Sequence, residues 1–223
     1  MARKTSFGIC EVCGARQAKG AISGHLRKCL AEEEPLKGSP SELLQLRVQA
    51  KGSSLYWLDL EIRGEAKLKA LDEFLRRIWL ECCGHLSAFR INGVTYEVVV
   101  EREWGAAASR GMNCRIGDVL TMGERFTYDY DFGSTTELTG QIRGLREGCI
   151  GRGPVRAVAR NEAPMWPCEV CGEPGTLICG ACAYGVTGFC CDQHADQHDC
   201  GEEAMLPVVN SPRMGVCGYT GDA

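Results

Sequence analysis

Apolar and polar side chains alternate along several short stretches in the middle of the chain, and this pattern predicts β-strands. Residues typical of turns separate neighbouring stretches, as expected of hairpins. The strongest turn signal is Asn92-Gly93, which lies between two apolar runs and is typical of a type I′ hairpin. The predicted strands and hairpins cover residues 42–50, 55–62, 86–91, 94–101, 124–145 and 155–159.

One stretch, residues 65–82, has the spacing of an amphipathic helix instead. Its apolar side chains, from Leu68 to Trp79, recur every three or four residues, and pairs of opposite charge lie on the other side. Because a sheet of hairpins has faces to cover, we expect this apolar stripe to pack in the core. The predicted fold class is α+β, with a mainly antiparallel sheet of hairpins packed on one main helix and flanked by two small zinc modules.

The second zinc module is predicted from the cysteines and histidines that are concentrated in residues 168–200. Two Cys-x2-Cys pairs precede mixed pairs of cysteine and histidine, and eight such ligands suffice for two tetrahedral zinc ions. Cys191 is preferred over Cys190 because it stands at the commoner spacing from His194, but Cys190 remains an alternative. The predicted ligands are Cys168, Cys171, Cys179, Cys182, Cys191, His194, His198 and Cys200.

The first zinc module is predicted by the spacing Cys-x2-Cys-x11-His-x3-Cys, formed by Cys10, Cys13, His25 and Cys29. It is close to a two-Cys two-His ββα finger with cysteine as the fourth ligand. A helix over residues 21–30 would place the last two ligands on one face, with Ile22 packed beneath the metal. Mixed thiolate and imidazole ligands favour zinc over an iron–sulfur cluster, so we predict three zinc ions per chain, in closed structural sites.

Charge is distributed unevenly along the chain, although the net charge is only −4. Residues 1–30 carry six basic side chains against Glu11, whereas residues 161–223 carry nine acids against Arg213. This asymmetry excludes a uniformly basic nucleic-acid-binding protein but leaves a basic N-terminal module. Its candidate phosphate contacts are Arg16, Lys19, Arg27 and Lys28.

The chain has 15 cysteines, no apolar run long enough for a transmembrane helix, and no secretory signal at its start. We therefore expect a cytoplasmic protein, bound to no membrane, whose cysteines are metal ligands or buried thiols. Cys82 and Cys83 have no Cys-x2-Cys companion and are expected to be buried thiols or to pack at the end of the helix. His85 is expected to be a structural histidine, with a catalytic base as the alternative.

Three carboxylates are the candidates for catalysis. In the hairpin over residues 124–145, the aromatic residues Phe126 to Phe132 are expected on one face, and Asp129, Asp131 and Glu137 on the other. A carboxylate cluster can bind a divalent ion or act as acid and base. A solvated strand face is the preferred explanation of the three residues, because no histidine or nucleophile accompanies them.

The chain resembles two known families. The strand pair with Tyr56-Trp57, the helix 65–82, HLSAFRI at 85–91, IGDVL and YDYDFG are similar to the Ri-plasmid ORF-3-like family of insertion-element passenger proteins, over residues 41–160. That family continues after Asp-Phe-Gly with an acidic residue, a tryptophan and a histidine. This chain has Ser134, Thr136 and Leu138 there, and it shows no serine-recombinase constellation.

The second resemblance is to the cross-brace zinc modules of MYND and B-box type, which are protein-interaction units. It implies that Cys168, Cys171, Cys191 and His194 share one zinc ion, and that Cys179, Cys182, His198 and Cys200 share the other.

The expected organisation is a zinc finger (1–30), a linker (31–40), an ORF-3-like α+β domain (41–160), a cross-brace module (161–202) and a loosely ordered tail (203–223). The expected function is that of a zinc-binding, non-enzymatic interaction or adaptor protein with a protein partner, linked to mobile-element or nucleic-acid processes. The alternatives are a nucleic-acid-binding protein that uses the basic finger, and a metal-dependent enzyme that uses the hairpin carboxylates.

Overall fold

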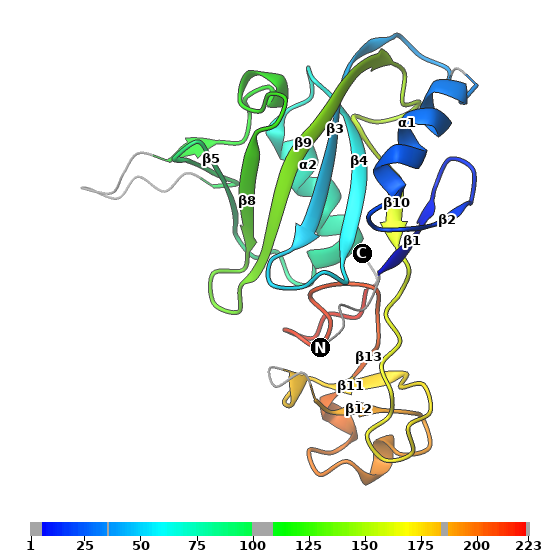
Figure 1. Ribbon diagram of the computed structural model, residues 1–223. Coiled ribbons are helices and arrows are strands. Elements are labelled where there is room, and N and C mark those ends of the chain that lie inside the picture. Colours follow the sequence, from blue (N-terminus) through cyan, green and yellow to red (C-terminus); the bar gives the residue numbers. More distant parts are fainter. Residues whose placement is uncertain (1–5, 35, 100–108, 184–186, 222–223) are drawn as a thin grey trace. The chain divides into compact units, whose positions relative to one another are not determined.

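The computed structural model describes residues 6–34, 36–99, 109–183 and 187–221. The chain forms two compact units, Met1–Phe74 with Leu86–Glu162, and Leu75–His85 with Ala163–Ala223. A ten-stranded sheet with the order β2-β1-β10-β4-β3-β9-β8-β5-β6-β7 builds the first unit (Figure 1). Neighbouring strands are antiparallel, apart from β6 and β7. The predicted α+β class is confirmed.

The ten strands are β1 (Phe7–Cys10), β2 (Arg16–Ala18), β3 (Ser41–Ala50), β4 (Trp57–Arg63), β5 (Ser87–Ile91), β6 (Val94–Glu97), β7 (Arg110–Gly111), β8 (Arg125–Tyr130), β9 (Thr136–Gly148) and β10 (Val155–Asn161). Asn92 and Gly93 have φ angles of 49° and 77°, as a type I′ turn between β5 and β6 requires. Residues 100–101 of the predicted strand 94–101 lie outside the described residues.

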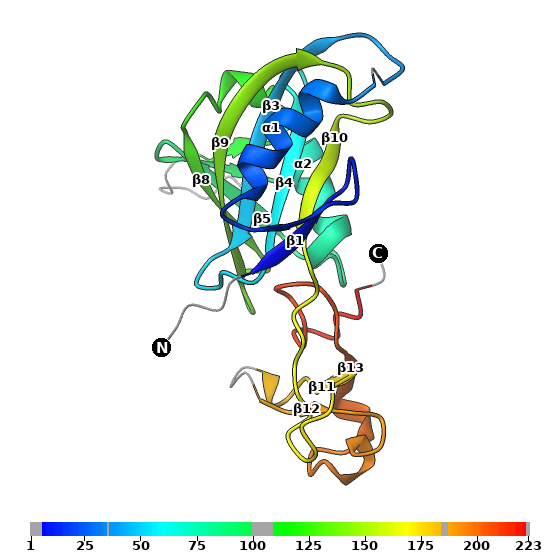
Figure 2. The same ribbon diagram turned by 45° about the vertical axis from the view of Figure 1, so that its right-hand side comes forward.

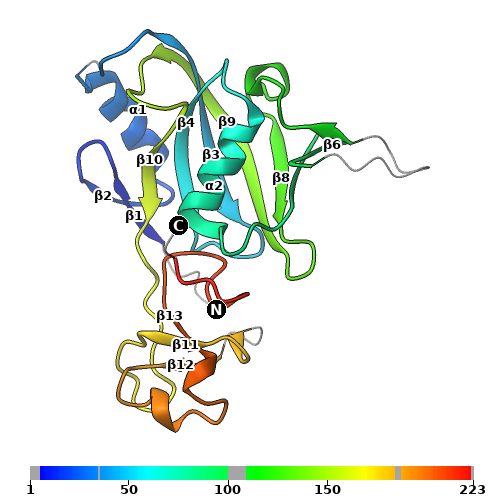
Figure 3. The ribbon, with the colours of Figure 1, turned by 180° about the vertical axis from the view of Figure 1, so that it is seen from behind.

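Helix α2 (Leu68–Leu75) covers one face of the sheet, as the view from behind shows (Figure 3). Leu68 and Leu71 are completely buried, and so are Leu58, Leu60 and Tyr128 among the sheet residues. The predicted stripe therefore belongs to the core. No helix in the part of the chain that the structure describes is both long and apolar enough to cross a membrane.

The main helix differs from its predicted bounds at both ends. It begins at Leu68, and its last turn, Arg76–Leu80, is a π-helix in which the Glu81 N–H donates to the Arg76 carbonyl at 2.9 Å. The Arg76 guanidinium also pairs with the Glu81 carboxylate at 2.9 Å and donates to the His85 carbonyl at 2.7 Å. These contacts end the helix and fix the chain that follows it.

The other face of the sheet carries helix α1 (Ile22–Glu32), which lies across β4 and β10 (Figure 2). Buried Ile22, Leu26 and Leu30 pack there with Trp57, in one hydrophobic cluster. The predicted finger is thus built into the large sheet, because β1 pairs with β10. Gly8 permits this pairing, since a Cβ atom there would lie 2.5 Å from the Trp57 ring.

The second unit contains a three-stranded sheet of β11 (Leu177–Cys179), β12 (Phe189–Cys190) and β13 (Met205–Pro207), in the order β12-β11-β13. The expectation of a loosely ordered tail after residue 202 does not hold. β13 pairs with β11, and Ser211, Arg213 and Tyr219 are buried. Pairing with a distant strand orders this segment, and nothing local in the sequence indicates that pairing.

Candidate metal centres

The first predicted ligand group comes together between a hairpin and α1. β1 ends at Cys10, the next turn carries Cys13, and α1 presents His25 and Cys29 one turn apart. The four ligand atoms lie within 4.8 Å of one another. Ile22 is buried in the same cluster as Cys10, in the place that the sequence predicted for it.

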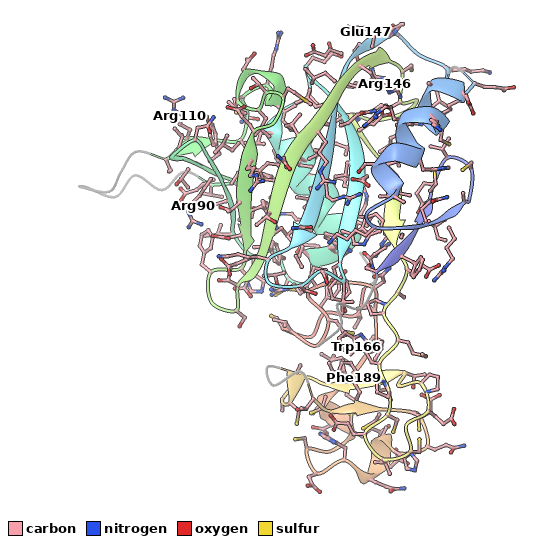
Figure 4. The ribbon with its side chains drawn as sticks, in the orientation of Figure 1. Arg90, Arg110, Arg146, Glu147, Trp166 and Phe189 are labelled. Atoms are coloured by element: carbon pink, nitrogen blue, oxygen red, sulfur yellow. The ribbon has the colours of Figure 1, made fainter. Side chains whose placement is uncertain are left out.

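The C-terminal ligands form two groups, and the division follows the cross-brace order. One group is Cys168, Cys171, Cys191 and His194, and the other is Cys179, Cys182, His198 and Cys200. Cys191 lies in the first group, whereas Cys190 lies in β12 outside both. Trp166 stacks on Phe189 beside these groups, with ring centroids 4.7 Å apart and planes 5° apart (Figure 4).

Sulfur–sulfur distances within these groups fit a shared metal ion. They are 3.8 Å for Cys10–Cys29, Cys171–Cys191 and Cys182–Cys200. A tetrahedral ion with metal–sulfur bonds of about 2.3 Å has sulfur–sulfur edges of about 3.8 Å, whereas a disulfide bond is about 2.05 Å long. The three groups are therefore suited to binding a metal ion such as zinc, and their thiols are not paired as disulfides.

The first Cys-x2-Cys pair of each module sits in the same kind of turn. The sequence Cys-Glu-Val-Cys-Gly occurs at residues 10–14 and again at 168–172. The Gly14 N–H donates to the Cys10 carbonyl at 2.8 Å, and the Gly172 N–H donates to the Cys168 carbonyl at 2.9 Å. Both glycines have positive φ, which this turn needs. The repeated pentapeptide is a sequence signal that the two metal-binding turns have the same structure. A search for ligand spacing alone does not detect this repeat.

The pKa values of the thiols in the group of Cys179, Cys182, His198 and Cys200 favour a bound cation. Burial opposes ionisation of Cys179, but backbone N–H groups of Cys182 and Ala181 outweigh it and lower the pKa of Cys179 to about 7, so one thiolate forms readily. Hydrogen bonding with Cys179 and its other neighbours raises the pKa of Cys182 to about 12. A second thiolate is disfavoured beside the first unless a positive ion lies between them. The donor set therefore fits a divalent metal ion.

A fourth group of potential ligands combines residues that the sequence did not predict to lie together. Cys82, Cys83, His85 and Cys217 place their ligand atoms within 4.8 Å of one another. Cys82 is half-buried and Cys83 is exposed, so the expectation of buried thiols does not hold, whereas the structural role expected of His85 stays a prediction. The group escapes a spacing search because His85 and Cys217 are 132 residues apart. Each of the four groups has three cysteines and one histidine, so together they use 12 of the 15 cysteines and all four histidines.

The four basic candidates do not form one surface. Arg16 forms an ion pair with Glu162 at 2.6 Å and lies 3.9 Å over the Phe7 ring, so it is engaged within the protein. Lys19 donates to the Ser54 carbonyl at 3.1 Å. Arg27 and Lys28 are exposed on α1. Lys19 lies near Arg47 and Arg143, which belong to the larger positive region described next.

A pocket of about 510 Å³ lies on the large sheet and is strongly basic. Its lining includes the arginines Arg47, Arg90, Arg125 and Arg143, contributed by β3, β5, β8 and β9. Asp59 pairs with Arg47, and Asp129 pairs with Arg90. Burial, followed by repulsion from Arg47 and Arg143, lowers the pKa of Lys19 to about 8. The pocket therefore has an excess of positive charge.

The carboxylate candidates are occupied by separate partners. Asp129 pairs with Arg90, Glu137 pairs with Lys51 at 2.5 Å, and Asp131 accepts from the Gly133 N–H at 3.0 Å. They form none of the potential metal groups found among the described residues. Phe132, expected on the inner face, is 52% exposed because Asp131 adopts a φ of 63° and ends the alternation after Tyr130.

Comparisons with known proteins give no assignment. No family model matches the chain, and no curated protein matches it. One solved structure that resembles it is a protein of unknown function, MM3350, from Methanosarcina mazei Go1, with 16% identity and a TM-score of 0.47. The match covers 56% of this chain and 72% of that chain. Membership of the insertion-element passenger family stays a prediction.

Proposed function

We propose that this chain is a zinc-binding interaction protein whose metal ions are structural. The observation that carries the proposal is the donor set of the three predicted groups, each with three cysteines and one histidine. Such a set fills all four positions of a tetrahedral zinc ion and leaves none for water or substrate, as catalysis would require. The hairpin carboxylates are engaged elsewhere, which supports a non-enzymatic role.

A protein partner is supported by the second zinc module. The cross-brace order of its ligands is shared with MYND and B-box modules, which bind proteins. Met165, which precedes the first Cys-x2-Cys turn of this module, and Val170, which lies in that turn, are 78% and 63% exposed. Apolar side chains held outward by a metal-fixed turn are suited to contact with another protein.

Cobalt substitution tests the closed character of the metal sites. Reconstitution of the metal-free chain with Co²⁺ is expected to give the intense visible absorption of tetrahedral cobalt with thiolate ligands. Because protein ligands fill every position, added cyanide or azide should leave the spectrum unchanged, and Zn²⁺ should displace the cobalt. A spectrum that shifts on adding the small anions would show an open position, and would contradict a purely structural role.

The basic pocket favours a second candidate function, binding of the phosphate backbone of a nucleic acid. Arg125 and Arg143 are exposed and project from neighbouring strands, and Arg143 lies beside Arg47 and Lys19. The Arg143 side chain reaches solvent but is partly covered, and this partial burial, followed by repulsion from Arg47, lowers its pKa, so an anion in the pocket would stabilise its charge. We therefore propose the sheet, rather than the N-terminal finger, as the surface that would contact nucleic acid.

A salt titration tests the second function. A labelled DNA duplex and a labelled single-stranded RNA are titrated with wild type, the double variant R125A/R143A and the control R152A, in which an exposed arginine of the β9–β10 connection is removed. The double variant is expected to bind at least about tenfold more weakly, and its log–log salt slope should be smaller by about two. Equal binding by all three proteins would count against a nucleic-acid partner.

A further inference from the structure

The fourth Cys/His group lies at the junction of the main helix with the C-terminal segment. Cys82, Cys83 and His85 follow the π turn that ends the helix, and Cys217 comes from the end of the chain. All four belong to the same compact unit. We propose that these four side chains bind a fourth zinc ion, which fastens the C-terminal segment to the end of the main helix.

Distances between the ligand atoms support a shared ion. The sulfur–sulfur distances are 3.7 Å for Cys82–Cys83 and 3.8 Å for Cys83–Cys217, close to the tetrahedral edge of about 3.8 Å. The His85 Nε2 atom lies 3.0 Å from the Cys83 sulfur and 3.3 Å from the Cys217 sulfur. The geometry thus matches the three groups whose spacing alone predicts zinc.

The backbone at Cys217 is a second and independent observation. Cys217 has a φ of 52°, and it is one of three non-glycine residues with positive φ among the described residues. Gly215 and Gly218 on either side are also left-handed, with φ of 77° and 67°. A cysteine in this conformation is strained and persists only where other contacts hold it. Metal coordination by its sulfur atom supplies such a contact.

Charge balance around the group also fits a zinc ion. Three thiolates, one neutral imidazole and Zn²⁺ carry a net charge of −1. The Arg213 side chain, completely buried, directs its Nη2 atom at the Cys82 sulfur at 3.5 Å. Ser211 accepts from the Arg213 N–H at 2.9 Å and donates to the Trp79 carbonyl at 2.6 Å. A buried cation is therefore placed beside the thiolates that it would neutralise.

The ion would act as a long-range cross-link. It joins His85 to Cys217, which are 132 residues apart, and so closes most of the second half of the chain into a loop. Closing a long loop removes conformational freedom from the unfolded chain. Its role is distinct from those of the two cross-brace sites, which fix local turns within residues 168–200.

Native mass spectrometry of the full chain, loaded with Zn²⁺, tests the inference. Wild type and the control C149S, which removes a thiol outside the four groups, are expected to bind four ions. C217S should bind three, while C217H, which restores a ligand, should bind four. C217S should also be cut faster by protease within residues 205–221.

The outcomes separate this inference from the proposed function. Three ions in wild type, or four in C217S, would overturn the fourth site and leave the other three standing. A mass lower by two hydrogens, from a disulfide among Cys82, Cys83 and Cys217, would overturn it too. No zinc in wild type would overturn both proposals. The wild-type count decides even if C217S does not fold.

Discussion

Removal of zinc by a chelator is expected to unfold residues 163–221 while the large sheet stays folded. The small sheet has only three short strands, and few apolar side chains are buried among the described residues of 163–221, among them Ile178, Phe189 and Ala195. A module of this size needs metal binding to fold, and structural zinc contributes about 10 kcal/mol or more per site. The central strands of the large sheet bury their own apolar core, with Leu46, Leu58 and Leu60 fully buried, and are expected to stay folded without an ion.

Amide hydrogen exchange measures this difference residue by residue. After chelation, protection should vanish at β11, β12 and β13 and fall at Cys10–Cys29, but persist in β3, β4 and β9. Restoring Zn²⁺ should restore protection, and Mg²⁺, which prefers oxygen ligands, serves as the control ion. Undiminished protection within residues 168–200 after complete loss of metal would show that the ions do not hold the module together.

Glu61→Gln is expected to destabilise the first unit by about 3 kcal/mol at neutral pH, because it leaves the half-buried Arg146 without a counter-charge and Arg156 with Glu33 alone. The Glu61 carboxylate is completely buried and accepts from Arg146 at 2.6 and 2.7 Å and from Arg156 at 2.9 Å. Gln45 donates to it at 3.0 Å. The Glu61 carboxylate therefore links β4 to β3, β9 and β10 through side-chain hydrogen bonds.

The pH dependence of this effect follows from the sign of the pKa shift. Burial alone would raise the pKa of Glu61, but hydrogen bonds from Arg146, Gln45 and Arg156 outweigh it and hold the pKa below its usual range. The ionised carboxylate thus contributes stability above its unfolded pKa, near pH 4.5, and this contribution is lost as the pH falls through the folded pKa.

Urea unfolding of wild type, E61Q and the control E42Q, an exposed position on β3, checks both points. The gap between wild type and E61Q should be large at pH 7 and shrink at pH 3, while E42Q should follow wild type. Acid also releases zinc, but it does so in all three proteins alike. A gap that is the same at both pH values would mean that the charge of Glu61 is not what stabilises the sheet.

Local patterns predicted most of the large sheet and its main helix. Alternation defined β3, β4 and β8, and Asn92-Gly93 defined its turn, because each depends on neighbours in sequence. What the sequence could not reveal were long-range pairings. β1 reaches β10 across some 150 residues, so the finger is joined to the sheet, and β13 reaches back to order the supposed tail.

The metal groups show the same division between local and distant information. Three groups were predicted because their ligands are brought together locally. Cys-x2-Cys turns do this, and so does a helix that carries two ligands one turn apart. The fourth was missed because adjacent Cys82 and Cys83 give no familiar spacing, and Cys217 joins them only through the tertiary fold. The basic pocket was missed for a similar reason, since its four arginines come from four separate strands.

Metal counting on the intact, folded chain tests the central claim most directly. The chain is purified without added chelator, its mass is recorded under native and then denaturing conditions, and the metal is identified by elemental analysis. The account predicts a native mass that exceeds the denatured mass by four zinc ions, lost together with the fold of residues 163–221. A folded chain whose native mass equals that of the polypeptide alone would contradict it.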